Sequence, residues 1–166
     1  MALCCILGLF SKKLINPAAN VLTEALHIPG GISTGFSIMF LVIVAELLRI
    51  PCCGLKMGTA QGLLALALGR VGSMGVLSPI GYIAPGLAID LIYLLPCFRT
   101  SDRAVRMMLA NALAAVTASM TANLIVFHLW GPALWLYLSV SATSGALFGM
   151  LGSAVAARLA KAIDPF

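Results

Sequence analysis

Apolar residues run through this chain in long stretches that contain almost no charge. The stretch Ile38–Leu48 holds Glu46 as its one charged residue, and Leu63–Leu68 holds none. A helix needs roughly 20 apolar residues to cross a membrane, whereas a barrel strand needs about ten residues of alternating character. Because these stretches do not alternate, they predict membrane-spanning helices and not a barrel.

The scarcity of charge indicates the same class of protein. Charged residues make up 9% of the 166 positions and hydrophobic residues 61%, whereas soluble domains carry roughly 25% charged residues. This composition excludes a soluble enzyme and a disordered linker. Lys and Arg do not cluster with interleaved aromatic residues, so no nucleic-acid partner is indicated. We therefore expect an integral membrane protein, embedded in the lipid bilayer of the cell membrane.

Glycine, proline and charged residues divide the chain into six expected spans, which together form one domain over residues 1–166. Six helices of about 20 residues each leave room only for short loops. The fold class expected is therefore an all-α bundle of six transmembrane helices. The expected spans are Ala2–Ala25, Thr34–Ile50, Leu55–Gly69, Ile80–Leu95, Ala104–Leu129 and Leu138–Ala162.

The distribution of Lys and Arg predicts the orientation of this bundle. With alternate loops assigned to opposite sides, one side has Arg70 alone and the other has seven basic residues. Cytoplasmic loops are enriched in Lys and Arg, so both termini are expected in the cytoplasm. We interpret the net charge of +5 in this way, and not as a basic binding face. The seven residues are Arg49, Lys56, Arg99, Arg103, Arg106, Arg158 and Lys161.

The five cysteines are expected to be free thiols on the reducing side. They are odd in number and have no Cys-x-x-Cys spacing, and the two histidines lie far from them in sequence. These features argue against a zinc or iron–sulfur site. We expect no metal and no cofactor.

Small residues recur at every fourth position on three of the expected spans. Such stripes let helix backbones approach closely inside a bilayer. We interpret them as packing faces within the bundle, with a docking face for another membrane subunit as the alternative. The stripes are Gly54, Gly58 and Gly62; Ala110, Ala114, Ala118 and Ala122; and Ser141, Gly145, Gly149, Ser153 and Ala157.

Ionisable side chains inside a membrane are costly, so each is expected to have a partner or a function. Glu46 lies at a depth that matches Lys12 and Lys13, which predicts a Lys–Glu pair between the first two spans. The alternative is that the lysines extend to the cytoplasmic headgroups. For Asp90, we expect a pair with Lys13 or Arg106, or contact with a ligand.

Polar and aromatic residues gather at the outer end of the expected bundle. Aromatic rings beside a few convergent polar groups form small-molecule pockets, although Trp and Tyr at this depth also form interfacial belts. Glu24 and Asp90 would balance a cationic heterocycle, whereas Arg70 favours a carboxylate or phosphate. The candidate binding residues are Asn20, Glu24, His27, Gln61, Arg70, Tyr82, Asp90, Asn123, His128, Trp130 and Trp135.

One segment is similar to a catalytic motif of membrane proteases. The segment Ala142–Gly149 resembles the serine-bearing Gly-x-Ser-Gly segment of rhomboid intramembrane proteases. However, Ala142 stands where the motif has its first glycine, and no histidine follows Ser144 to accept its proton. A serine without such a base is not activated. We therefore expect no catalytic residues and no enzyme activity.

Two other segments resemble the substrate-binding S components of energy-coupling factor (ECF) transporters, the vitamin-uptake relatives of ABC importers. They are Asn16–Gly31, which leads into the second span, and Gly58–Asp90. The resemblance extends to chain size, six-span layout and loop placement, and is nearest to the thiamine and hydroxymethylpyrimidine branch. The family's docking face commonly has Ala-x-x-x-Ala early in the first span. Here Ala2 and Ile6 stand at that spacing, which departs from the pattern.

The resemblance implies capture of a substrate and not catalysis. Such a subunit binds a vitamin or vitamin precursor outside the cell, with a thiamine-like heterocycle favoured here, and docks on a transmembrane coupling subunit that carries two ATPase subunits. The chain has no Gly-x-x-x-x-Gly-Lys-Ser/Thr phosphate loop, so only those partners would use ATP. The alternatives are a non-transport membrane scaffold or assembly subunit, and a stand-alone secondary transporter. The latter class usually has internal repeats, and none is evident.

Overall fold

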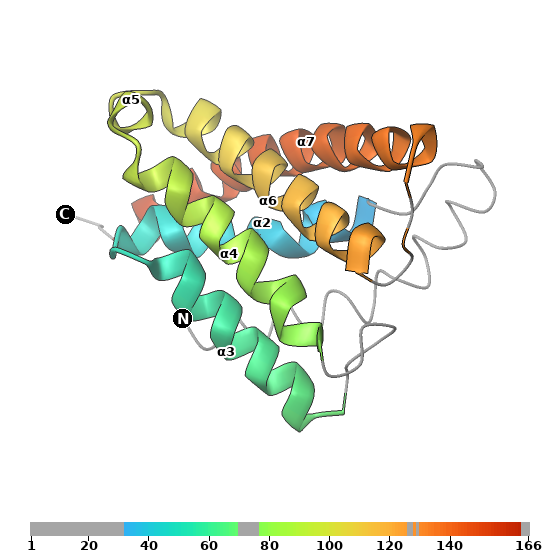
Figure 1. Cartoon of the computed structure of the whole chain (residues 1–166). Helices are drawn as coiled ribbons and strands as arrows, with labels where there is room; N and C mark the ends of the chain where they lie inside the picture. Colours follow the sequence, from blue (N-terminus) through green and yellow to red (C-terminus); the bar gives the residue numbers. More distant parts are fainter. Residues whose placement is uncertain (1–31, 70–76, 126–127, 129, 164–166) are drawn as a thin grey trace.

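The computed structural model describes residues 32–69, 77–125, 128 and 130–163, and this part of the chain is helical without any strand (Figure 1). The all-α class is thereby confirmed. The first expected span, Ala2–Ala25, lies outside the described residues. The described helices are α2 (Ile32–Leu48), α3 (Cys53–Ala67), α4 (Ser78–Leu94), α5 (Pro96–Arg99), α6 (Arg103–Ile125) and α7 (Pro132–Ile163).

Proline sets the start of several of these helices. It occupies one of the first two helical positions of α4 and α5, where its missing N–H costs nothing and its fixed φ suits the helix. The one-turn helix α5 forms between the fourth and fifth expected spans. Pro132 likewise begins α7, directly after Gly131 with φ 95°. The helix α7 therefore begins six residues before the expected Leu138.

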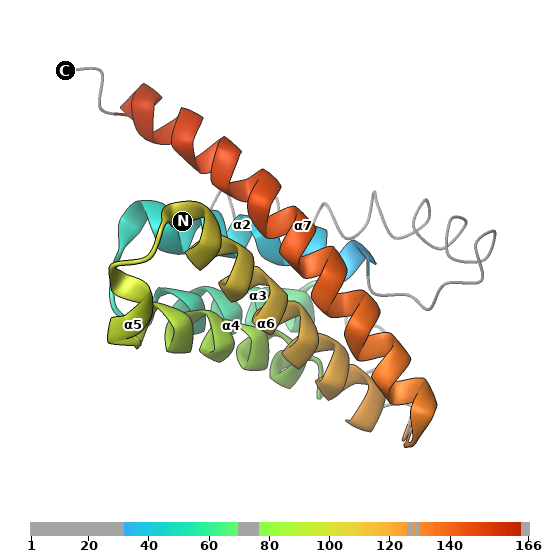
Figure 2. The same ribbon diagram turned by 90° about the horizontal axis from the view of Figure 1, so that it is seen from above.

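The helices pack as two antiparallel pairs, α3 with α4 and α6 with α7, and α2 lies against α6 and α7 (Figures 1 and 2). Helix α4 also packs on α6, which joins the two pairs. The core between them is apolar and includes Val42, Ile89, Met107 and Ala115, each almost fully buried.

The small-residue stripes on α3 and α7 lie where these helices touch their neighbours, as the packing interpretation predicted, and Ala110 and Ala114 of the α6 stripe are fully buried. On α3, a Cβ added at Gly58 would lie 2.5 Å from the carbonyl oxygen of Tyr82 on α4. On α7, a Cβ at Gly145 would lie 2.8 Å from the Cα of Ala112 on α6. No side chain fits at such distances, so glycine permits these contacts. Near the end of α7, the glycine that contacts another helix is Gly152, which faces Met39 of α2. The stripe residue Ser153 is only half-buried there.

Two of the helices are long and apolar enough to cross a membrane, namely Arg103–Ile125 and Pro132–Lys161. The helices Thr34–Leu48 and Pro79–Leu94 are also apolar but shorter. Large apolar side chains cover much of the exterior. Among the most exposed are Leu63, Leu94, Leu147, Leu151 and Leu136.

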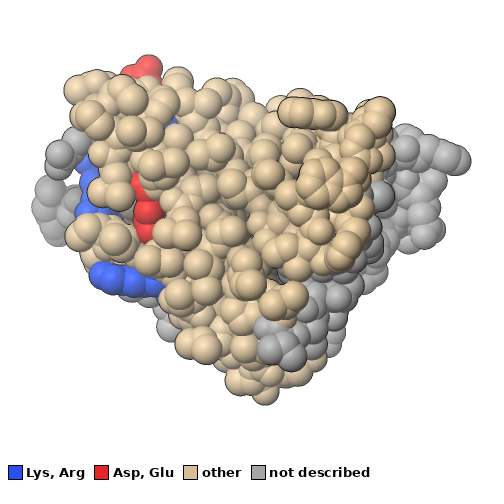
Figure 3. All heavy atoms as spheres, in the orientation of Figure 1, with Lys and Arg blue, Asp and Glu red and all other residues tan. Residues whose placement is uncertain are grey.

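Charge is confined to one end of the described bundle (Figure 3). We call it the charged end; α2, α4 and α7 finish there, and α3 and α6 begin there. We call the opposite end, where the described helices carry no Lys, Arg, Asp or Glu, the neutral end. The charged residues among those described are Glu46, Arg49, Lys56, Asp90, Arg99, Asp102, Arg103, Arg106, Arg158 and Lys161.

Candidate functional site

A small cavity with polar groups in its lining lies in the half of the bundle nearer the neutral end, between α2, α3, α4 and α6. Its volume is about 20 Å³, which is room for roughly one water molecule. The structure brings two of the predicted binding residues together here, Gln61 from α3 and Tyr82 from α4. We call this space the neutral-end cavity. Its lining residues are Thr34, Ser37, Ile38, Leu41, Gln61, Gly81, Tyr82, Pro85 and Ala118.

Helix periodicity explains this lining. Thr34, Ser37, Ile38 and Leu41 are spaced by three and four residues, so they share one face of α2.

The polar groups of the cavity lie inside the bundle, and only 4% of the surface of Gln61 is exposed. The cavity thus offers an amide, a phenol and hydroxyl groups among apolar side chains, which is the mixture that orients a small ligand.

Asn123 lies on α6, nearer the neutral end, but does not line this cavity. Its side-chain Nδ2 donates a hydrogen bond to the Oγ of Ser119, at 3.2 Å, one turn earlier on the same helix. Both side chains are buried. The described contact of Asn123 is therefore a local one along α6.

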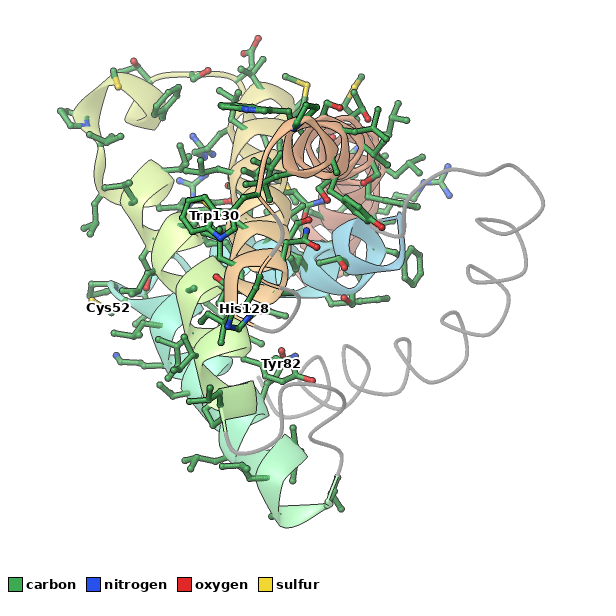
Figure 4. All side chains as sticks on the ribbon, turned by 45° about the vertical axis from the view of Figure 1, so that its right-hand side comes forward. Cys52, Tyr82, His128 and Trp130 are labelled. Atoms are coloured by element: carbon green, nitrogen blue, oxygen red, sulfur yellow. The ribbon has the colours of Figure 1, made fainter. Side chains whose placement is uncertain are left out.

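The two predicted tryptophans at the neutral end are exposed and, unlike Tyr82, do not line the cavity. Trp130 is 78% exposed and Trp135 is 74% exposed. His128 is also exposed, in a left-handed backbone conformation with φ 50°. Figure 4 shows Cys52, which precedes α3 at the charged end, at the left edge of the molecule, and Tyr82, His128 and Trp130 to the right of it. The exposure of both tryptophans fits the alternative of an interfacial belt.

Four further candidate residues, Asn20, Glu24, His27 and Arg70, lie outside the described residues, as do Lys12 and Lys13.

Asp90 lies at the charged end, apart from the other described candidates. Its Oδ1 accepts a hydrogen bond from the backbone N–H of Gly54, and its Oδ2 accepts one from Leu55, both at 2.8 Å. These N–H groups are at the first turn of α3, where helices leave their donors unpaired and favour negative charge. The expected pair of Asp90 with Arg106 is not formed, because the Arg106 guanidinium binds Glu46. In the described structure Asp90 caps a neighbouring helix.

Glu46 is surrounded by arginines at the end of α2. Arg106 binds it through two hydrogen bonds, Nη2 to Oε1 at 2.7 Å and Nε to Oε2 at 3.0 Å. Arg49 and Arg103 approach the same Oε1 at 3.2 Å and 3.6 Å. The Tyr93 hydroxyl donates to Oε2 at 3.1 Å. Among the described residues, the partners of this carboxylate are therefore arginines and a tyrosine, where the sequence predicted Lys12 or Lys13.

Arg106 was not predicted to be the main partner of Glu46, although its position in the sequence indicated that the two residues lie at the same depth. It begins the second turn of α6, and Glu46 is in the last turn of α2, so both lie at the same depth. Its other nitrogen, Nη1, donates to the carbonyl oxygens of Phe98 and Ser101 at 3.3 Å and 3.2 Å. The hydrogen bonds of the Arg106 guanidinium thereby connect α2 and α6 with the turn around α5.

A larger cavity, which we call the charged-end cavity, opens beside this ion cluster. Its volume is about 430 Å³, within the range of roughly 300–1,000 Å³ that is usual for small-molecule sites. Its lining includes both charged and apolar side chains: Ala45, Arg49, Ile50, Pro51, Cys52, Cys53, Asp90, Tyr93, Leu94 and Arg106.

In the described ranges, no group of three His, Cys, Asp or Glu side chains is placed to hold a metal ion. Cys53 is buried, and Cys52 and Cys97 are exposed as free thiols. The two cavities and the arginine cluster are among the features of the described bundle that offer specific chemistry.

Comparison with known proteins gives no match: no protein-family model, no curated protein and no solved structure matches this chain.

Proposed function

We propose that this protein is the membrane-embedded substrate-binding subunit of an ECF-type importer, and that it captures a vitamin or vitamin precursor outside the cell. A thiamine-like heterocycle is the favoured substrate class. The observation that carries the proposal is that charged side chains and uncharged polar side chains lie in opposite halves of the bundle. Uncharged hydrogen-bonding groups line a cavity in its neutral half, and all described charge lies at the opposite end.

The apolar exterior and the charge distribution support placement across the cell membrane. Two helices have the length and apolar character to cross it, and the exposed leucines would face lipid. Seven basic residues against three acidic ones at the charged end favour the cytoplasm for that end. The neutral end would then face outward, where a substrate arrives.

The chemistry of the neutral-end cavity supports a heterocyclic ligand. The Gln61 amide both donates and accepts hydrogen bonds, as the ring nitrogen (an acceptor) and the exocyclic amine (a donor) of an aminopyrimidine require, and the Tyr82 ring offers a surface for stacking. The cavity is much smaller than the roughly 300 Å³ at the lower end of ligand pockets. Binding would therefore require the surrounding helices to separate, which makes a conformational change part of capture.

Energy for uptake would come from other proteins. The chain has no phosphate loop of its own. In the proposed assembly a transmembrane coupling subunit and two ATPase subunits therefore supply ATP hydrolysis. No enzymatic step is assigned to this chain.

The experiment that tests the proposal is a ligand screen on the full chain in nanodiscs, by thermal shift and then calorimetry. Thiamine and hydroxymethylpyrimidine are compared with vitamins that lack a pyrimidine, since a ligand that binds the folded state raises its apparent stability. Gln61→Leu should weaken binding about fivefold or more, because a lost hydrogen bond to a desolvated group costs about 1–3 kcal/mol. Tyr82→Ala should weaken it by a similar factor.

Tyr137→Ala is the matched control, because Tyr137 lies on α7 near the neutral end but does not line the cavity. It should bind like the wild type. The proposal is wrong if no heterocycle stabilises the protein, or if Gln61→Leu and Tyr82→Ala both bind a stabilising heterocycle as tightly as the wild type does.

A further inference from the structure

The arginine cluster at the charged end carries more positive charge than its carboxylate can balance. Arg49, Arg103 and Arg106 all approach the same oxygen, Oε1 of Glu46. One carboxylate compensates one guanidinium, so two positive charges remain uncompensated within this cluster. Like charges at such distances repel each other. A second anion beside the cluster would relieve that repulsion.

The other acidic groups of the charged end balance this positive charge only in part. Asp90 lines the charged-end cavity and carries one negative charge, but its two carboxylate oxygens accept hydrogen bonds from backbone N–H groups at the start of α3. Asp102 is exposed and does not line the charged-end cavity. The carboxylates of the described residues therefore leave the cluster with an excess of positive charge.

Arg106 and Arg49 differ in how many of their N–H donors are already hydrogen-bonded within the described structure. Arg106 binds two oxygens of Glu46 and two backbone carbonyls, so it is held in place. Arg49 makes one hydrogen bond to the described residues, from Nη2 to Glu46, although a guanidinium has five N–H donors. Its side chain is 67% exposed and lines the charged-end cavity. Arg49 thus has donors to spare at the opening of a cavity of ligand size.

We propose that the charged-end cavity is a binding site for a phosphate-bearing anion, held mainly by Arg49 with Arg106 behind it. A planar guanidinium matches phosphate oxygens in bidentate geometry. Phospholipid headgroups and soluble phosphate esters share this chemistry. The site is at the opposite end of the molecule from the proposed vitamin cavity and is independent of it.

The test uses the full chain and two sources of phosphate. In the first arm, the chain in dodecyl maltoside micelles, which contain no phosphate, is titrated with inorganic phosphate, against sodium chloride of equal ionic strength. In the second, phosphatidylglycerol is added to the same micelles. The readouts are the apparent Tm and, for free phosphate, calorimetry. Arg49→Gln removes the charge and keeps a polar side chain, and Arg158→Gln removes an exposed charge at the same end outside the cavity.

At least one phosphate source should raise the Tm of the wild type and of Arg158→Gln. Arg49→Gln should weaken that binding about tenfold or more, because charge-assisted hydrogen bonds are the strong class. Stabilisation by phosphatidylglycerol alone would identify a lipid headgroup, and stabilisation by free phosphate would identify a soluble ester; either result supports the site.

The proposal is overturned if neither source stabilises the wild type, or if Arg49→Gln and Arg158→Gln respond alike. Circular dichroism and gel filtration establish that Arg49→Gln is folded. If it is not, Arg103→Gln takes its place under the same criteria, because it reduces the same cluster charge at a side chain that is 41% exposed.

Discussion

Gly149 and Gly152 lie about one turn apart on α7 and offer a matched test of close helix packing. A Cβ at Gly149 would lie 2.7 Å from the carbonyl oxygen of Met107 and 2.7 Å from the Cα of Met108, both in the backbone of α6. A Cβ at Gly152 would lie 2.8 Å from the Cγ of Met39 on α2. The difference is that backbone cannot yield without moving a helix, whereas a methionine side chain can change its rotamer.

The expected magnitudes follow from these contacts. Alanine in place of glycine stabilises a helix interior by about 0.5–1 kcal/mol, and both variants share this gain. At Gly149 the new Cβ is about 0.7 Å closer than ordinary contact allows, and overpacking of this kind costs about 1–3 kcal/mol. We expect Gly149→Ala to lower the free energy of unfolding by about 1–2 kcal/mol, and Gly152→Ala to change it by less than about 0.5 kcal/mol.

The measurement is unfolding of the purified chain by SDS in mixed micelles, followed by circular dichroism. Gly149→Leu, with a larger side chain at the same contact, should lose still more stability or fail to assemble. The reasoning is refuted if Gly149→Ala is as stable as the wild type, or if Gly152→Ala loses as much stability as Gly149→Ala does.

Three further predictions concern the charged end. Glu46→Gln should lower the free energy of unfolding in SDS by about 3 kcal/mol, because Arg106 would remain buried without a counter-ion. A loss below about 1 kcal/mol would show that the Glu46–Arg106 pair does not stabilise the fold. Asp90→Asn should cost about 1–3 kcal/mol in the same assay, because an amide nitrogen cannot accept the hydrogen bond that one carboxylate oxygen now receives. In single-cysteine variants, Cys52 and Cys97 should react with a membrane-impermeant maleimide only after cells are opened, and labelling of intact cells would contradict the orientation.

The helix boundaries were largely predictable because their determinants are local. Glycine, proline and charge interrupt the apolar stretches, and the expected ends of the spans that correspond to α2, α3 and α4 fall within two residues of the observed ends. The start of α7 lies six residues before the expected Leu138, because Pro132 is a favourable first residue of a helix.

The partners of the buried charges were not predictable in the same way. Depth in a membrane follows from counting residues, and depth alone matched Glu46 with the lysines of the first span. Which helix face a residue occupies relative to a distant helix depends on how the bundle packs. Arg106 meets Glu46 because α2 lies against α6, and Asp90 meets the start of α3 because α3 and α4 approach through glycines. Local sequence patterns do not specify either contact.

The packing of α3 against α4 also limits how the neutral-end cavity can widen. These two helices touch along their length through the glycine stripe, and Asp90 holds the start of α3 through two hydrogen bonds. Helix α2 makes far fewer contacts with α3 and α4 than they make with each other. The face of α2 from Thr34 to Leu41 forms one wall of the cavity, and Gln61 and Tyr82 form the opposite one. In the proposed function, a ligand of vitamin size would therefore enter by parting α2 from the α3–α4 pair, with the pair moving as one body, because separating α3 from α4 would break the close contacts at Gly58 and Gly62.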